Sequence, residues 1–216
     1  MRQIIWSAVG AVFGWRALCL ASRDIAKLRY QGTTFGQGHL TDRFVAPVVA
    51  LIVGSASWWA LSNRLNNEAT LVVYGLWCAG LMRLFFIDVD THVLPRRTVV
   101  GATIWGIAGL CVVSLFDSNG SVVEMMLAAS IMWGVLKFLE IISRGDLGAG
   151  DVSMAPLLGL FTGWLALEKV FTALVLAFFI GGVYATILMV SKRASRRTFI
   201  AFGPFLIAGA FISVLR

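Results

Sequence analysis

Charged residues are scarce in this chain of 216 residues: they make up 13% of it, against about 25% in soluble domains. Cysteine is also rare, and its three residues lie singly in apolar stretches without any Cys-x-x-Cys pair. The sequence therefore offers neither a disulfide framework nor a zinc ribbon. Because 59% of the residues are hydrophobic and the mean hydropathy is +0.86, a soluble domain is excluded and an integral membrane protein is predicted.

Eight apolar runs predict the fold, since each membrane span needs about 20 such residues. We expect an all-α polytopic bundle of about eight transmembrane helices, forming one domain over residues 1–216. The first run lacks a good cleavage site, so it is interpreted as a retained span and not as a removed signal peptide. The runs are Gln3–Ala21, Val45–Ser62, Ala69–Ile87, Thr98–Phe116, Ser121–Ile142, Val152–Leu167, Val170–Val190 and Phe199–Leu215.

The net charge of +7 would suggest a nucleic-acid partner in a soluble protein. Here the basic residues gather in alternate loops, and the positive-inside rule assigns those loops to the cytoplasm, with no nucleic acid expected. Eleven Lys and Arg residues fall in the loops 22–44, 88–97, 143–151 and 191–198, whereas the opposite loops hold only Arg64 and Lys169. The same assignment places four acidic residues on the cytoplasmic face: Asp88, Asp90, Asp146 and Asp151.

Two aspartates at the edges of apolar runs are the leading candidates for chemistry. Asp151 follows the Gly148-Ala149-Gly150 turn, where the alternative is a helix N-cap. Asp88 ends the third run, where the helix dipole disfavours a carboxylate; the alternative is an interfacial residue that reaches water. Ionisable groups at membrane depth are costly, which makes both of them functional candidates.

Two carboxyl groups held close together share a proton, so that one can activate water and the other can protonate the substrate. The helix ends suggest Asp151 as the base and Asp88 as the acid. Gly148 and Gly150 would let the chain turn sharply and let a substrate backbone approach, or would simply form a flexible loop.

Other polar residues near these aspartates have open roles. Asp88, Asp90 and His92 form a D-x-D-x-H string that could hold a divalent metal, but we expect no metal, because two carboxylates suffice for this chemistry. Asp90 is otherwise expected to form a local hydrogen bond, to face solvent or to contact substrate. Asp146 is either a solvated loop charge or a contact for a basic peptide.

Three blocks of the sequence resemble the type IV prepilin peptidases, a family of bacterial aspartyl proteases with a GxGD motif. They are FIDVDTHVLP (Phe86–Pro95), GAGDVSMAPLLGLFTGW (Gly148–Trp164) and FGPFLIAGA (Phe202–Ala210). The order and spacing of the blocks match the family's pattern.

The resemblance implies that Asp88 and Asp151 are catalytic and that the substrate is a prepilin-like protein. Such a substrate has a short basic leader and a hydrophobic N-terminal helix, and it is cut at the cytoplasmic face of the bacterial inner membrane, among membrane lipids. Phe202, Gly203 and Pro204 would then line the groove for that helix or pack the final span.

The sequence departs from the family pattern at three places. The loop 22–44 lacks the two Cys-x-x-Cys pairs of many members, and Arg96 and Ser153 replace an Asp and a Lys. N-methyltransferase activity is therefore not expected, and no cofactor is expected unless that activity, which uses S-adenosylmethionine, is retained. The alternative is a noncatalytic membrane component of a pilus or secretion machine that keeps the fold.

Overall fold

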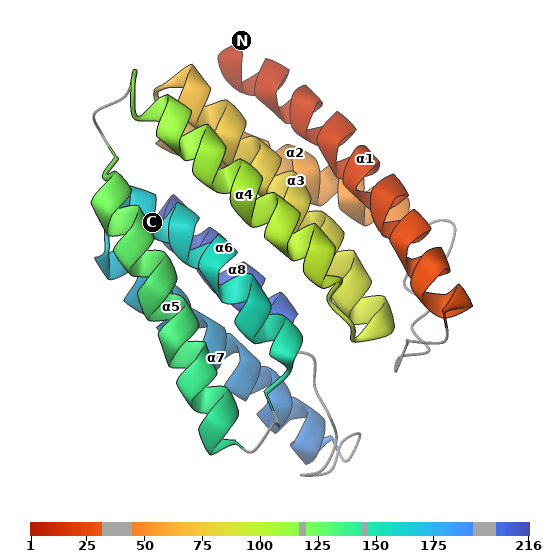
Figure 1. Cartoon of the computed structure of the whole chain (residues 1–216). Helices are drawn as coiled ribbons and strands as arrows, with labels where there is room; N and C mark the ends of the chain where they lie inside the picture. The colour runs from red at the N-terminus through yellow and green to blue at the C-terminus, as the bar shows by residue number, and fades with distance from the viewer. Residues whose placement is uncertain (32–44, 117–119, 144–146, 192–201) are drawn as a thin grey trace. The chain divides into compact units, whose positions relative to one another are not determined.

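The computed structural model describes residues 1–31, 45–116, 120–143, 147–191 and 202–216. Over these residues the chain forms eight α-helices and no strand, which confirms the predicted all-α class (Figure 1). The helices are α1 (Arg2–Tyr30), α2 (Val45–Arg64), α3 (Glu68–Thr91), α4 (Arg96–Val113), α5 (Val122–Ile142), α6 (Ala149–Leu165), α7 (Glu168–Val190) and α8 (Gly203–Leu215).

Six of these helices are long and apolar enough to cross a membrane, namely α1, α2, α3, α4, α5 and α7. The other two, α6 and α8, have 17 and 13 residues. In a bilayer every backbone polar group must be bonded internally, and a helix satisfies this requirement within one segment. The chain is therefore a polytopic helical membrane protein.

The helices fall into two compact units, Met1–Ser118 with α1 to α4 and Asn119–Val214 with α5 to α8. Each unit has its own packing. The expectation of one domain over residues 1–216 stays a prediction.

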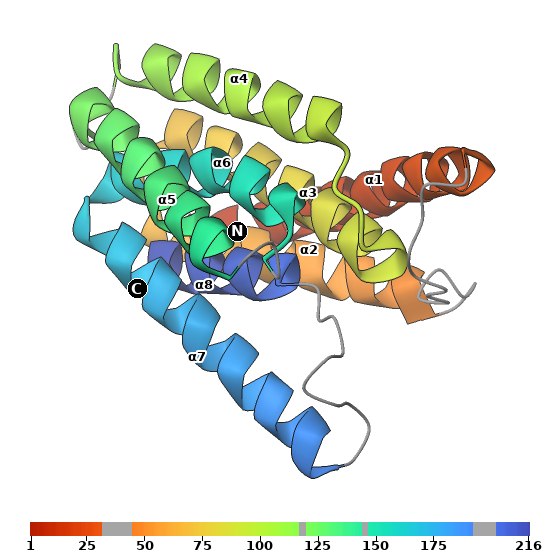
Figure 2. The same cartoon turned by 60° about the horizontal axis from the view of Figure 1, so that its bottom comes forward.

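In the first unit, α3 is the central helix, and it packs on α1, α2 and α4 (Figures 1 and 2). It begins at Asn67, whose side-chain oxygen accepts hydrogen bonds from the amides of Ala69 and Thr70. α1 and α2 approach closely because small residues face each other: a Cβ added to Gly14 would lie 2.2 Å from the carbonyl oxygen of Ala50. This packing places the last turn of α3 against the second half of α1.

In the second unit, α5 and α6 lie side by side (Figure 1). Two glycines of α6 allow this approach: an added Cβ at Gly159 would lie 2.7 Å from the carbonyl oxygen of Ala128, and one at Gly163 would lie 2.0 Å from the Ala128 Cβ. Just beyond the C-terminal end of α6, the Ser213 hydroxyl of α8 donates a 2.7 Å hydrogen bond to the carbonyl oxygen of Lys169 in α7. These contacts hold α6, which begins with the GxGD motif, in a fixed place within its unit.

Two helix ends differ from the sequence prediction. α1 continues to Tyr30, nine residues beyond the expected end of the first run, so the first part of the expected loop 22–44 is helical. α3 continues to Thr91, so Asp88 and Asp90 lie in its last turn and not in a loop. The α1 extension is amphipathic, since Ile25 is buried in a core cluster while charged residues lie on either side of it. The α3 extension instead holds three buried polar residues, Asp88, Asp90 and Thr91.

Candidate active site

The first aspartate motif forms the end of α3, and the chain leaves this helix through a single residue in the left-handed region. His92 has φ of 52°, the only positive φ among the non-glycine residues that the structure describes. Its amide donates a 2.8 Å hydrogen bond to the carbonyl oxygen of Asp88, which closes the helix. Pro95 then precedes the first residue of α4. The sequence DTHVLP thus ends one helix and starts the next within four residues.

Thr91 fixes the path of the chain at this exit. Its buried hydroxyl lies 2.7 Å from the carbonyl oxygen of Ile87, and it accepts a 3.3 Å hydrogen bond from the amide of Val93. A side chain that bonds to the backbone on both sides of a helix end restricts that end to one geometry. The last turn of α3 is therefore a rigid platform for its aspartates.

Asp88 is buried, with 5% of its surface exposed. Within the described part of the chain, its Oδ2 atom has no hydrogen-bond partner, and Asp88 takes part in none of the ion pairs found there. A buried oxygen without a donor costs about 1–3 kcal/mol and calls for an explanation. A carboxyl oxygen left open in this way is suited to meet a substrate, a water molecule or a second carboxyl group.

Asp90 lies two residues further along, and its Oδ2 atom likewise has no hydrogen-bond partner within the described residues, but its other oxygen is ion-paired. It is fully buried, and its Oδ1 atom accepts a 2.8 Å hydrogen bond from Nη2 of Arg29 in α1. Of the roles weighed for Asp90, the solvent-facing one is wrong, because Asp90 is fully buried, and its hydrogen bond joins two helices; its contact with substrate stays a prediction. Sequence reasoning missed Arg29, because this residue was assigned to a loop.

The Gly148–Asp151 segment forms the start of α6. Gly148 is the N-cap residue, and Asp151 lies in the first turn, where the helix dipole favours a negative charge. The alternative that Asp151 is itself the N-cap is therefore wrong. Asp151 is 5% exposed, so it is a buried carboxylate like Asp88 and Asp90.

Glycine is needed at position 148 because a side chain would not fit there, and not because the backbone adopts a special conformation. Its φ and ψ angles, −63° and 133°, are open to any residue. An added Cβ, however, would lie 3.3 Å from Oδ2 of Asp151, closer than such atoms normally approach. The expected need for a sharp turn is not what requires glycine at position 148; the Asp151 carboxylate occupies the volume beside it.

The FGPF block packs within its own unit. Gly203 and Pro204 begin α8, and the ring of Phe202 lies 5.0 Å from that of Phe178 in α7. The ring of Phe205 lies 5.2 Å from that of Tyr184. The structure thus supports packing of the final helix, while the role of Phe202, Gly203 and Pro204 in holding substrate stays a prediction.

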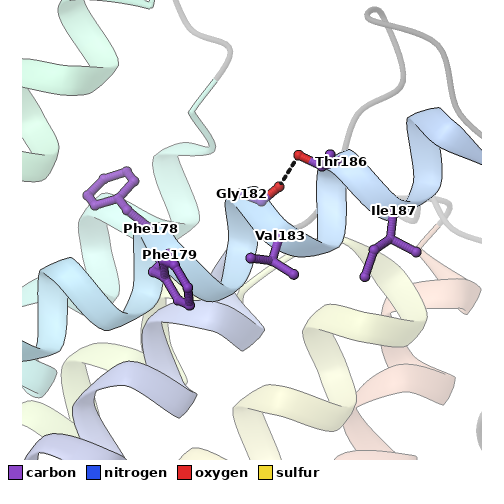
Figure 3. A pocket seen from close by; sticks show the side chains of 6 residues that line it. All are labelled: Phe178, Phe179, Gly182, Val183, Thr186 and Ile187. Carbon is purple, nitrogen blue, oxygen red and sulfur yellow. Dashed lines mark hydrogen bonds between the residues drawn. The ribbon is translucent and has the colours of Figure 1, made fainter.

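Beside this aromatic contact, α7 carries an open apolar hollow of about 420 Å³ (Figure 3). Its polar groups already pair with each other, since the Thr186 hydroxyl donates a 2.8 Å hydrogen bond to the carbonyl oxygen of Gly182. The hollow is lined by Phe178, Phe179, Gly182, Val183, Thr186 and Ile187. No titratable side chain is among these residues, so the hollow offers contact surface and no chemistry.

Two other predictions concern Asp146 and the D-x-D-x-H string. Asp146 lies outside the described residues. Among the residues that are described, no group of three or more His, Cys, Asp or Glu side chains could hold a metal ion. The ring of His92 instead lies with Nδ1 3.1 Å from the carbonyl oxygen of Asp88.

Both aspartate motifs fall inside a region that matches a known family. The sequence profile described as the type IV leader peptidase family matches residues 75–186, which is more than half of the chain. The chain belongs to the type IV leader peptidase family. The prediction made from the three sequence blocks is thereby confirmed.

Several curated relatives carry the name prepilin leader peptidase/N-methyltransferase. The protein from Burkholderia pseudomallei (strain 1026b) is 31% identical over 172 residues, covering 76% of this chain and 52% of the relative. The one from Stutzerimonas stutzeri is 28% identical, covering 78% of this chain and 57% of the relative. The one from Escherichia coli (strain K12) is 27% identical, covering 64% and 60%. No solved structure matches.

The chain spans about half the length of such curated relatives, for example 52% of the Burkholderia pseudomallei protein. Family membership together with six long apolar helices makes it an integral membrane protein of a bacterial family. The activity that the relatives are named for is therefore only proposed for this chain.

Proposed function

We propose that this protein is a membrane aspartyl endopeptidase that removes the leader peptide from type IV prepilin-like substrates. The observation that carries the proposal is the state of Asp88, a buried carboxylate inside the family's matched region whose Oδ2 atom has no donor among the described residues. Asp151, buried in the first turn of a helix in the same matched region, supplies the second carboxyl group.

The reaction is a hydrolysis that two carboxyl groups catalyse together. Asp151, in its charged form, takes a proton from water as the water oxygen bonds to the carbonyl carbon of the scissile peptide. Asp88, in its neutral form, gives its proton to the carbonyl oxygen. The carbon–nitrogen bond then breaks as Asp151 gives its proton to the nitrogen and one hydroxyl of the tetrahedral intermediate returns a proton to Asp88. The products are a leader with a new carboxylate and a pilin with a new amino group.

The proposed substrate combines a short basic leader with a hydrophobic helix. Such a helix lies in the membrane beside the apolar helices of the protein, while the leader and the scissile bond lie at the cytoplasmic face. Gly148 leaves the Asp151 carboxylate in its place, and Gly150, which has no side chain, is the candidate for close approach of an extended peptide backbone. Asp146 is the candidate contact for the basic leader, and Phe202, Gly203 and Pro204 are candidates for the apolar helix.

Methyl transfer, which the names of the relatives include, is not part of the proposal. The segment 22–44 contains no cysteine, whereas the resemblance links that activity to forms with Cys-x-x-Cys pairs. S-adenosylmethionine takes part in no step of the proposed hydrolysis. An added methyl group on the mature pilin, detected by mass spectrometry, would contradict this restriction.

The test is to express the protein with pilin-like proteins of the same genome and to measure leader removal by gel mobility and mass. We expect Asp88→Asn and Asp151→Asn each to abolish cleavage, because an amide can neither accept nor donate the proton. Glu68→Gln is the matched control, since Glu68 is an exposed carboxylate at the opposite end of α3. Cleavage that survives either aspartate substitution removes that residue from the mechanism. No cleavage by the wild type would favour the noncatalytic pilus or secretion component.

A further inference from the structure

Two ion pairs of opposite polarity join α1 to α3 near the first aspartate motif. Asp24 of α1 pairs with Arg83 of α3, with 2.6 Å between Oδ2 and Nη2. Arg29 of α1 pairs with Asp90 of α3, with 2.8 Å between Nη2 and Oδ1. The polarity reverses along the helices, because the acid belongs to α1 in one pair and to α3 in the other. A shift of α1 along α3 would bring like charges together, so each pair by itself disfavours a shifted register.

The helical period explains why these two pairs share a face of α3. Arg83 and Asp90 are seven residues apart, nearly two full turns, so both face α1. Asp88 precedes Asp90 by two residues, which turns its side chain by about 200° around the helix axis. Residues at this spacing do not face each other. Asp90 is therefore directed to α1 and Asp88 is directed away from it.

Because Asp88 and Asp90 lie on different faces of the last turn of α3, they have different neighbours. Asp90 is fully buried, and Arg29 occupies one of its oxygens, while 45% of the Arg29 side chain stays exposed. The Oδ2 atoms of both aspartates meet no donor within the described residues, but Asp88 takes part in none of the ion pairs found there. The ion pair with Arg29 fixes the position of Asp90. Because the last turn of α3 is rigid, the position of Asp88 is then fixed as well.

We infer that Arg29 and Asp90 are a positioning pair, which anchors the last turn of α3 to α1 and thereby sets the direction of the Asp88 carboxyl group. This inference rests on the proposed function, since it concerns the same reaction. It assigns Asp90 to the support of the site and identifies Arg29, outside all three motif blocks, as a determinant of the catalytic rate.

The first test compares Arg29→Gln with Arg83→Gln, each of which removes one of the two ion pairs between α1 and α3. Arg29→Gln should lower kcat for leader removal by roughly 10- to 100-fold with little change in KM, because a displacement of about 1 Å at a reacting group has an effect of this size. Arg29→Lys keeps the charge and should recover part of the loss. Arg83→Gln breaks the other ion pair, about 10 Å away along the helix, and should leave kcat per folded enzyme unchanged.

Three results would overturn the inference. The first is a wild-type kcat in Arg29→Gln, and the second is an equal loss in Arg83→Gln, which would indicate general packing of α1 on α3. Should Arg29→Gln fail to accumulate, Asp90→Asn removes the same charge pair with nearly unchanged shape. Failure of Arg29→Gln, Arg29→Lys and Asp90→Asn to fold would also overturn the inference, because the pair would then serve stability alone.

The second test does not depend on catalysis. Asp88→Cys is introduced after Cys19, Cys78 and Cys111 are replaced, and its labelling rate with a small thiol reagent is measured in membranes. Adding Arg29→Gln should raise this rate severalfold, and adding Arg83→Gln should not. An altered rate without any cleavage by the wild type would retain the positioning pair and reject the peptidase. Cleavage by the wild type, together with an Arg29→Gln substitution that changes neither the labelling rate nor kcat, would retain the peptidase and reject the positioning pair.

Discussion

At the scale of the residue, the contact between Gly148 and Asp151 defines how little space surrounds the second carboxyl group. We expect Gly148→Ala to lower kcat for leader removal by roughly 10-fold, because the new methyl group would lie 3.3 Å from Oδ2 and displace it. The free energy of unfolding should fall by no more than about 1 kcal/mol, the usual cost of losing a favourable N-cap residue. Steady-state kinetics and thermal unfolding in detergent measure the two effects.

The control for this substitution is Gly134→Ala in α5, where an added Cβ would meet no atom within 4 Å among the described residues. It should leave kcat unchanged. If Gly148→Ala also cleaves at the wild-type rate, the carboxylate moves freely and the proposed geometry around Asp151 is contradicted.

The sequence located both candidate aspartates, but it did not reveal their surroundings. Burial of Asp88 and Asp151 was predictable, because each borders a long apolar run. The partner of Asp90 was not predictable, since Arg29 is 61 positions away and belongs to a segment with the composition of a loop. A pairing between distant charged residues depends on how helices pack, and local pattern contains no information on it.

At the scale of the element, the contact between α5 and α6 is the most sensitive to side-chain size. We expect Gly163→Ala to lower the thermal midpoint clearly, because its Cβ would lie 2.0 Å from that of Ala128 and one helix must move. Overpacking of this kind costs about 1–3 kcal/mol. Gly134→Ala, in the open part of α5, should instead raise stability slightly, since alanine favours the helix by about 0.5–1 kcal/mol.

Thermal unfolding of the two variants, measured at equal detergent concentration, tests this expectation. Equal midpoints would show that α5 and α6 can separate without loss, and they would contradict the close packing described here.

All eight helices were predicted by their apolar runs, and the errors lie at their ends. The extensions of α1 to Tyr30 and of α3 to Thr91 consist of mixed charged and apolar residues. Hydropathy alone ends a span at the first charged residue, whereas packing continues the helix wherever one face stays buried. The ion pairs of Arg29 and Arg83 lie in or beside these extensions. Hydropathy therefore predicted neither the helical extensions nor the residues that pair there.

At the scale of the whole molecule, the proposed mechanism requires the two units to bring Asp88 and Asp151 together. We expect Asp88→Cys with Asp151→Cys, in a chain without its native cysteines, to react with a short bifunctional thiol reagent. A membrane-impermeant reagent should join them when it is added to the cytoplasmic side and not to the opposite side. Loss of the single-thiol signal in mass spectrometry measures the reaction.

The control pair joins Asp88→Cys to Glu168→Cys, which lies beyond the far end of α6. It should not react. If the 88–151 pair fails to react from either side, with or without a prepilin substrate, the two-aspartate mechanism is contradicted, whatever the behaviour of each unit alone.

The length and burial of α6 have a consequence for the supply of water. Its 17 residues rise about 26 Å, less than the roughly 30 Å of a typical hydrocarbon layer. Twelve of these residues are buried, so α6 is enclosed by protein and does not have to match the thickness of the lipid. In the proposed hydrolysis, water therefore reaches Asp151 from the N-terminal end of α6, where this residue lies in the first turn.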